Sequence, residues 1–192
     1  MSARPGVLLC VLLCAPWSMQ AIAADLKSII VEYEDGVYTV DSEVWFDADQ
    51  RAVYAVFADW DLAVRFSSAI VESRNTAPDA DGNPGYFVRN EGCILFFCKS
   101  FVRNGTVRSQ PISLLQASAD PAHSDFELSD ERWSFRSEDG GTIVNYSLKM
   151  KPAFWVPPLI GPYLIKRKLR NDSGDALNRI EQIAKDWKPA SG

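Results

Sequence analysis

Few side chains in this sequence are placed to carry out covalent chemistry. The one histidine, His123, lies in the segment Asp-Pro-Ala-His-Ser-Asp, whereas a general base needs a positioned partner and a pocket. Loops of this composition lie on the surface, so we expect His123 to be exposed. The acids lack metal-ligand spacing, and Ser67, Ser68 and Ser173 lack a base of the triad kind. We therefore assign no catalytic residue, no metal and no cofactor.

Four polar residues of the predicted strands are the remaining candidates for chemistry: Arg89, Glu91, Arg103 and Tyr146. Arg89 and Glu91 share one face because side chains alternate along a strand. These residues would act on a ligand if their strands turn them inward. We favour the alternative, an exposed ion pair between strands, because charged side chains are seldom buried unless they are paired.

Large apolar side chains with a few polar tips indicate binding rather than catalysis, because they are typical of small-molecule cavities. Trp133 and Phe135 share one face of a strand, and so do Tyr146, Leu148 and Met150. The candidate ligand contacts are Phe87, Phe101, Trp133, Phe135, Tyr146, Leu148, Met150, Phe154 and Asn171. The alternative for each aromatic residue is ordinary core packing.

The N-terminus has the parts of a secretory signal peptide. Arg4 precedes an apolar run from Val7 to Cys14, and small residues follow at Ala21-Ile22-Ala23-Ala24. We predict that residues 1–24 are a leader and that the protein is exported, to the periplasm or outside the cell. A lipoprotein signal is the alternative, but Leu13, before Cys14, is not the small residue that such a signal needs.

The rest of the chain, residues 25–192, has the size and composition of one globular domain. The sequence is 47% hydrophobic and 23% charged. Its net charge of −5 becomes about −6 once Arg4 is removed, so we expect no general attraction for nucleic acid. The basic run Lys166, Arg167, Lys168 and Arg170 is a solvated helix face or a transient membrane contact. The oligomeric state stays open.

Two cysteines, Cys93 and Cys98, remain after the leader is removed. An oxidising compartment makes a disulfide between them one interpretation. The alternative is a pair of small buried thiols. On a straight strand the two side chains would point to opposite faces, so a disulfide needs a turn or bulge between them.

The hydrophobic pattern predicts strands, two short helices and a long C-terminal helix. Val37–Phe46 reads as the first strand, preceded by a mixed segment that ends in the turn Asp35-Gly36. Short helices over 50–58 and 62–66 follow. Further strands are predicted over 69–75, 86–91, 94–97, 99–108, 112–118, 126–137 and 142–150, with a break at Gly92 and a bulge at Gly105.

The C-terminal segment begins at Pro157-Pro158, a suitable first helical turn. Its apolar stripe comprises Leu164, Ile165, Leu169, Ala176, Leu177, Ile180, Ile183, Ala184 and Trp187. Asn171 to Gly174 interrupt the stripe, so they either kink the helix or place polar atoms toward a hydrated environment.

Several phrases, in this order and spacing, carry a family resemblance. They are Val53-Tyr54-Ala55-Val56-Phe57-Ala58-Asp59-Trp60, Ile70-Val71-Glu72-Ser73-Arg74, Glu131-Arg132-Trp133-Ser134-Phe135 and Pro152-Ala153-Phe154-Trp155-Val156-Pro157-Pro158. From Val37 to Trp187 the chain resembles the polyketide cyclase and coenzyme Q-binding branch of the START-like, or SRPBCC, superfamily. The resemblance implies an α+β helix-grip fold, in which a curved antiparallel sheet wraps around one long C-terminal helix, with a hydrophobic tunnel between them.

The resemblance also directs the functional expectation. Members of this superfamily bind lipids, quinones, polyketides or hormones, and a minority are enzymes. We expect an exported protein that binds a hydrophobic small molecule, oriented by polar groups such as Tyr146 and Asn171. The alternatives are a cyclase or aromatase type of enzyme, and a protein-interaction domain with a solid interior.

Overall fold

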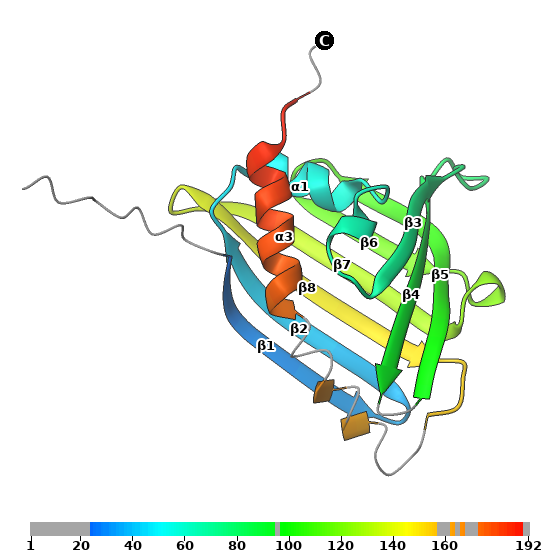
Figure 1. Ribbon diagram of the computed structural model, residues 1–192. Coiled ribbons are helices and arrows are strands. Elements are labelled where there is room, and N and C mark those ends of the chain that lie inside the picture. The colour runs from blue at the N-terminus through cyan, green and yellow to red at the C-terminus, as the bar shows by residue number, and fades with distance from the viewer. Residues whose placement is uncertain (1–23, 95–96, 157–161, 164–165, 168–172, 190–192) are drawn as a thin grey trace, which may run out of the picture.

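The protein folds as one curved antiparallel sheet with two helices against its concave face (Figure 1). The computed structural model describes residues 24–94, 97–156, 162–163, 166–167 and 173–189. The strands are β1 (Asp25–Glu34), β2 (Val37–Phe46), β3 (Ile70–Thr76), β4 (Gly85–Ile94), β5 (Phe97–Gln110), β6 (Leu114–Ala119), β7 (Phe126–Glu138) and β8 (Gly141–Pro152). The helices are α1 (Gln50–Ala58) and α3 (Ser173–Asp186), and short 3-10 turns span Ala63–Arg65 and Pro121–His123. The predicted helix-grip class is confirmed.

The sheet has the strand order β1-β2-β8-β7-β6-β5-β4-β3. Consecutive strands form hairpins, except where β2 pairs with β8 and brings the two ends of the domain together. The mixed segment before Asp35-Gly36 forms β1, so Val37–Phe46 is the second strand and not the first as predicted. Only Val31 of β1 is buried. The sequence of this edge strand therefore lacks the alternation of apolar and polar residues that predicts a strand.

The hairpin of β4 and β5 differs from the prediction at both of its glycines. Gly92 does not break the strand, because β4 is continuous from Gly85 to Ile94. Gly105 is not a bulge, because its register with both neighbouring strands is regular. A Cβ atom at Gly105 would lie 2.0 Å from the Ser118 carbonyl oxygen. Gly105 is therefore required by the close approach of two strands.

Cys93 and Cys98 face one another across the β4–β5 hairpin and are joined by a disulfide. Both side chains are exposed. The turn that a disulfide between these residues needs is supplied by the reversal of the chain between β4 and β5.

Helix α1 covers the upper part of the concave face. Asp49 caps its N-terminus by accepting a hydrogen bond from the Arg51 N–H at 2.8 Å. Val53 and Val56 are fully buried, and Phe57 makes aromatic contacts with rings of β2 and β7. This half of the concave face is therefore solid core.

Helix α3 packs beside α1 and begins at Ser173, within the predicted interruption. Ile180 and Ala184 are buried, whereas Gly174 is exposed. Leu164, Ile165, Leu169 and Asn171 lie outside the described residues. No helix in the described part of the chain is long and apolar enough to span a membrane.

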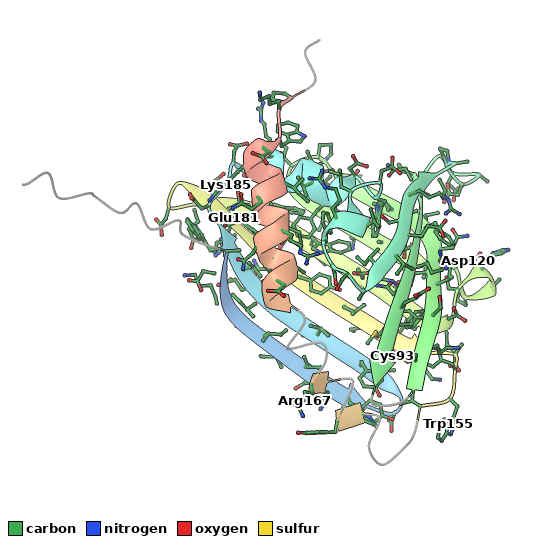
Figure 2. The ribbon with its side chains drawn as sticks, in the orientation of Figure 1. Cys93, Asp120, Trp155, Arg167, Glu181 and Lys185 are labelled. Atoms are coloured by element: carbon green, nitrogen blue, oxygen red, sulfur yellow. A yellow bond between two sulfur atoms is a disulfide. The ribbon has the colours of Figure 1, made fainter. Side chains whose placement is uncertain are left out.

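A buried carboxylate ties the C-terminal half of α3 to the start of α1. Glu181 is 1% exposed, and it accepts hydrogen bonds from the Asp47 N–H at 3.0 Å and from Lys185 Nζ at 2.9 Å (Figure 2). Lys185 also pairs with the Asp47 carboxylate at 2.9 Å. These bonds fix one end of α3, at the opposite end of the helix from Ser173.

Candidate ligand-binding site

Three polar side chains from three strands meet on the concave face. Arg103 of β5 forms an ion pair with Glu131 of β7, and the Tyr146 hydroxyl of β8 donates to the second carboxylate oxygen at 2.8 Å. The side chain of Arg103 is 17% exposed and that of Glu131 is 6% exposed. Charged groups are buried in this way only when they are paired, and here both oxygens of the carboxylate have a partner.

Local sequence explains how this polar cluster can form. Strand β6 lies between β5 and β7, and its residue opposite Glu131 is the buried Ala117. Arg103 lies beyond the last β5–β6 pair, Gly105 with Ala119, so no β6 residue is paired with it and its side chain reaches Glu131. On the next strand, Trp133 stands opposite Tyr146, and the two rings stack with centroids 5.3 Å apart. The stacking fixes the direction in which the Tyr146 hydroxyl points.

The surroundings keep the charges on the ion pair and keep the phenols neutral. Burial raises the pKa of Tyr146 well above its ordinary value, and the nearby Glu131 carboxylate raises it further. Burial opposes the charge of Arg103, but the Glu131 carboxylate together with Tyr86 and Tyr146 outweighs burial, so the pKa of Arg103 is raised. The cluster is therefore one cation, one anion and a neutral donor.

Several buried polar atoms near this cluster have no hydrogen-bond partner among the described residues. They are Tyr38 Oη, Tyr86 Oη, Asn90 Oδ1, Arg103 Nε and Ser129 Oγ on the inner side of the sheet. Leaving one such group unpaired costs about 1–3 kcal/mol. If this region served only for packing, apolar side chains at these positions would make the folded domain more stable. This region of the concave face thus has spare capacity for hydrogen bonds.

Strand register gathers three of the unpaired atoms around one arginine. Arg103 stands opposite Val88, and the flanking inward residues of β4 are Tyr86 and Asn90. Both are diagonal neighbours of Arg103, which puts them within reach of long side chains. Ser129 lies two residues before Glu131 on the same face of β7.

A hollow of about 500 Å³ opens next to this region. It is lined by residues 66–69, by Glu91, Gly92 and Cys93 at the end of β4, and by Asp175, Ala176 and Arg179 of α3. Alternation along β4 puts Gly92 on the inward face, where a glycine leaves space because it has no side chain. The next inward residue is Asn90. We call this hollow the mouth, since it opens to solvent beside Gly92, two residues from Asn90 along β4.

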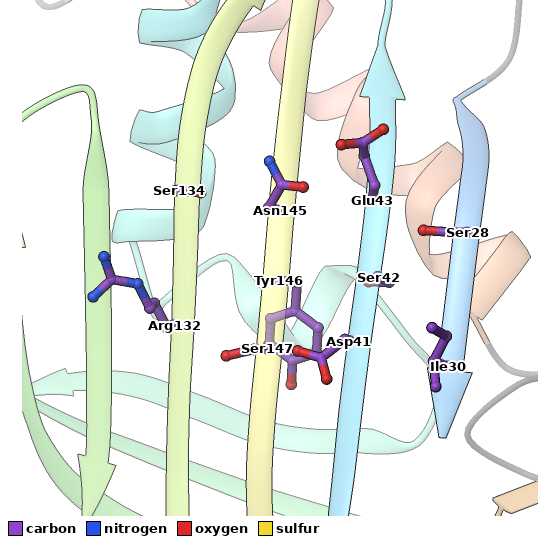
Figure 3. A pocket seen from close by; sticks show the side chains of 10 residues that line it. All are labelled: Ser28, Ile30, Asp41, Ser42, Glu43, Arg132, Ser134, Asn145, Tyr146 and Ser147. Carbon is purple, nitrogen blue, oxygen red and sulfur yellow. The ribbon is translucent and has the colours of Figure 1, made fainter. Parts of the chain in front are cut away.

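A second hollow, of about 380 Å³, lies on the other face of the sheet (Figure 3). Asp41, Glu43, Arg132 and Asn145 line it, and the helices lie behind the strands in this view. With its amide oriented to suit its neighbours, Asn145 donates to Glu43 at 2.9 Å and accepts from Arg136 at 3.0 Å. A polar, open groove of this kind does not suit a hydrophobic ligand.

The predicted ligand contacts fall into separate groups. Trp133 and Phe135 are buried against Phe57 of α1, so they belong to the solid core. Leu148 is buried and packs with Val31 and Val40, and Met150 and Tyr146 lie at the margin of that group.

The remaining predicted contacts lie farther apart. Phe101 and Phe154 form an aromatic group with the buried Phe126. Phe87 faces the outer side, where the Arg74 guanidinium lies 3.9 Å from its ring centroid. Asn171 is outside the described residues. The structure therefore brings together Tyr146, Leu148 and Met150, and separates Phe87 from them.

The polar candidates divide in the same way. Arg89 pairs with Glu72 at 3.1 Å and with Glu91 at 3.6 Å, and all three side chains are at least 40% exposed. This is the exposed ion pair that the sequence favours. Arg103 and Tyr146 do turn inward. His123 is 69% exposed, and its ring nitrogen Nδ1 lies 2.6 Å from the Asp120 carboxylate.

Sequence reasoning missed the residues that complete the cluster: Tyr86, Asn90, Ser129 and Glu131. The signal was present, because Glu131 is two residues before Trp133 and so shares its face. Tyr86 and Asn90 flank Val88 at the same spacing. No group of three metal-ligating residues occurs in the described part of the chain.

Comparison with known structures identifies the fold. The chain is similar to a START superfamily protein from Mycobacterium smegmatis, with 18% identity and a TM-score of 0.57 over 76% of this chain and 98% of that one. The fold is the START-like helix-grip fold. No protein-family model matches the sequence, and no curated protein sequence matches it.

Other START-like structures are similar over a greater part of the chain. A STAR-related lipid transfer protein from Xanthomonas axonopodis has 13% identity and a TM-score of 0.62, over 85% of this chain and 99% of that one. The Zhui aromatase/cyclase from Streptomyces sp. R1128 has 14% identity and a TM-score of 0.59, over 81% and 99%. The START-like fold is thus shared with both a lipid transfer protein and an aromatase/cyclase, and the fold alone does not choose between them.

Proposed function

We propose that the protein binds a hydrophobic small molecule between the sheet and the C-terminal helix, without covalent chemistry. The ligand would be a lipid, an isoprenoid or a polyketide-like molecule. The proposal is supported by the START-like fold, which the chain shares with a protein described as a lipid transfer protein. It is also supported by the mouth beside α3.

One observation carries this proposal more than the others. Several buried polar atoms of the concave face have no partner among the described residues, and Asn90, which carries one of them, is the next inward residue of β4 after Gly92 of the mouth. A bound molecule would supply the missing hydrogen bonds, while Leu148 and Met150 would contribute apolar contact. Burial of apolar surface stabilises such a complex by roughly 25 cal/mol per Å².

Native mass spectrometry tests the proposal. Protein from the exported fraction should carry an additional lipid-sized mass, and delipidated protein should take up the neutral fluorescent probe N-phenyl-1-naphthylamine. The variant Gly92→Phe places a ring in the mouth and should slow uptake about tenfold or more, because it blocks the opening. The matched variant Ser147→Phe puts the same ring on the outer face and should leave uptake unchanged. An apo mass together with no uptake of the probe would contradict the proposal.

Export is part of the proposal. We propose that residues 1–24 are cleaved as a signal peptide and that the mature protein acts outside the cytoplasm. Intact mass measurement on the mature protein checks this, because cleavage after Ala23 or Ala24 gives two specific N-termini. A protein that retains Met1 in the cytoplasm would contradict it.

An enzyme of the aromatase or cyclase kind is the second candidate. The inward-facing Arg103, Glu131 and Tyr146 favour it, since a polar cluster on the concave face could orient a reactive chain. For an enzyme, Tyr146→Phe should abolish turnover of a polyketide substrate and leave its affinity unchanged. A protein-interaction domain, the third class, would instead capture a protein and take up no probe.

Transient contact with a membrane accompanies the binding proposal. Trp155 is 72% exposed and Tyr163 is 66% exposed. Trp155 and Arg167 lie at the same end of the molecule as Cys93, which lines the mouth (Figure 2). Aromatic and basic side chains are typical of membrane surfaces. Flotation with vesicles containing anionic lipid should recover the protein, and Trp155→Ser should reduce recovery.

A further inference from the structure

We infer that the outer face of the sheet holds a second site, which binds a free amino acid with an apolar side chain. The site is the hollow of about 380 Å³ in Figure 3, which we call the outer groove. The inference does not rest on the proposed function, because the outer groove and the mouth share no residue. It is carried by an acid and a base that the fold places on either side of a serine without pairing them.

Two rows of polar side chains cross the outer groove, and the first row is complete. Asn145 of β8 stands opposite Glu43 of β2, and Arg136 of β7 is its diagonal neighbour. With the amide oriented to suit these neighbours, Asn145 donates to Glu43 at 2.9 Å and accepts from Arg136 at 3.0 Å. A group that carries both a donor and an acceptor thus bridges an acid and a base across three strands.

The second row also has an acid and a base, but it lacks the bridge. Ser147 of β8 stands opposite both Asp41 of β2 and Arg132 of β7. Asp41 and Arg132 are exposed, and neither forms an ion pair or a side-chain hydrogen bond with a residue that the structure describes. The serine side chain is too short to join them, so both charges border the groove without a partner.

Curvature of the sheet keeps the two charges apart. Since β2 and β7 are the two neighbours of β8, they lie about 9.5 Å from one another. On the concave face Arg103 reaches Glu131 over the same number of strands, because side chains converge there. On the outer face side chains diverge, and Figure 3 shows Arg132 turned away from Asp41. For the same reason two outer faces would touch only along a narrow strip, so a small molecule suits the groove better than a second copy of the chain.

A zwitterion matches this pair of charges. A guanidinium binds a carboxylate through two parallel hydrogen bonds, and an aspartate accepts hydrogen bonds from an ammonium group. An exposed side chain changes rotamer within nanoseconds, so Arg132 can turn over Ser147 to meet the carboxylate. An anion alone would lie beside Asp41, and a cation alone would lie beside Arg132. Either would leave one charge of the groove unmatched.

Ile30 selects the side chain of the ligand. It stands opposite Asp41 on β1, on the side away from Ser147, and it is 56% exposed. An amino acid whose ammonium group binds Asp41 would place its side chain over Ile30. Burial of apolar surface is favourable, so leucine should bind more tightly than glycine.

An NMR titration of the amide signals of residues 41 and 147 tests the inference, because it detects weak binding and locates it. Leucine should bind about tenfold more tightly than N-acetylleucine, which lacks the cation, and than leucinamide, which lacks the anion. Equal affinities for these three compounds would overturn the inference, and so would signals that leucine does not shift. Signals that shift with protein concentration instead of leucine would identify a second copy of the chain as the occupant, which also overturns it.

Variants that change one charge should exchange the preference. Asp41→Asn leaves the base alone and should make N-acetylleucine bind more tightly than leucine, whereas Arg132→Gln should favour leucinamide. Asp81→Asn and Arg65→Gln make the same changes of charge on exposed residues that do not line the groove, and should keep the preference for leucine. An unchanged preference in Asp41→Asn and Arg132→Gln would overturn the inference.

Two further variants separate the outer groove from the mouth. Ser147→Phe fills the floor of the groove and should abolish leucine binding, while uptake of N-phenyl-1-naphthylamine is unchanged. Gly92→Phe should slow uptake of the probe and leave leucine binding unchanged. Leucine binding that survives Ser147→Phe would overturn the inference, whereas a failure of the probe to bind would overturn the proposed function alone.

Discussion

The Tyr146 hydroxyl donates a hydrogen bond to the Glu131 carboxylate at 2.8 Å, between neighbouring strands that bury Glu131 and partly bury Tyr146. Glu131 also forms the ion pair with Arg103. One carboxylate on the concave face therefore makes two interactions, and removing its charge weakens both the ion pair with Arg103 and the hydrogen bond from Tyr146.

Glu131→Gln should lower the free energy of unfolding by about 3 kcal/mol, because it leaves the Arg103 charge buried without compensation. Urea denaturation followed by circular dichroism measures this. Glu127→Gln, which breaks the exposed pair with Lys151, should cost less than about 1 kcal/mol. The double variant Arg103→Met with Glu131→Leu should recover much of the loss. Equal losses in the two single variants would contradict the assignment of Glu131 as a buried ion.

Gly105→Ala should destabilise the protein by more than about 2 kcal/mol, because its Cβ would overlap the Ser118 carbonyl oxygen and force β5 away from β6. Gly174→Ala is the matched control, since nothing lies within 4 Å of a Cβ at that position of α3. A helical alanine should stabilise the protein by about 0.5–1 kcal/mol. Thermal unfolding of both variants gives the comparison, and similar shifts would show that the strands are farther apart than the structure has them.

Stability should fall as the pH rises from about 10 toward 12. Burial raises the pKa of Tyr38 to about 12 in the folded protein, from 10.0 for an ordinary phenol. The unfolded chain releases this proton first, so the contribution of neutral Tyr38 is complete below pH 10 and is lost as the pH approaches 12. Tyr86 and Tyr146 act in the same direction.

The urea midpoint as a function of pH measures this effect, and Tyr38→Phe should show a shallower alkaline fall than the wild type. Tyr163→Phe, which changes an exposed phenol, should follow the wild-type curve. Parallel curves for Tyr38→Phe and the wild type would rule out Tyr38 as a source of the alkaline dependence.

Reduction of the Cys93–Cys98 disulfide should loosen the hairpin and speed exchange of the probe through the mouth, because Cys93 lines it. The sequence separation of 5 is short, so loop-closure entropy alone gives about 2 kcal/mol of stabilisation. Hydrogen exchange of residues 85–94 in the Cys93→Ser and Cys98→Ser double variant checks the loosening. Unchanged hydrogen exchange in β4 together with unchanged probe kinetics would show that the disulfide does not control access through the mouth.

The sequence predicted the fold well where one face of an element is buried. Val37–Phe46 alternates clearly because β2 is covered on its inner side, and Val53 and Val56 mark the buried side of α1. At the sheet edge the sequence carries no strand pattern, because β1 buries only one residue. The predicted break at Gly92 is wrong, because strand propensity alone does not distinguish the end of a strand from a glycine within it.

The site was predicted only in part. Alternation of side chains along each strand and the order of strands in the sheet explain the differences. The prediction of Phe87 as a ligand contact is wrong, because alternation along β4 places Phe87 on the outer face together with Arg89 and Glu91. Arg103 and Tyr146 were candidates, but their common partner was not, because β6 separates β5 from β7 and no local pattern predicts a contact across a strand. Such contacts depend on sheet order, which only the structure supplies.

The pairing of β2 with β8 also determines how the chain reaches its native state. The bond from Trp45 Nε1 to the Glu138 carbonyl joins residues 93 positions apart, whereas the β4–β5 and β7–β8 hairpins close locally. Long-range pairings of this kind form slowly, because the chain loses the entropy of closing the intervening loop before the contacts between the strands stabilise it. During synthesis Val44 and Phe46 therefore have no neighbouring strand on one side until residues 141–152 emerge. The nascent N-terminal hairpin is a surface on which a chaperone, or a second unfinished chain, would compete with β8.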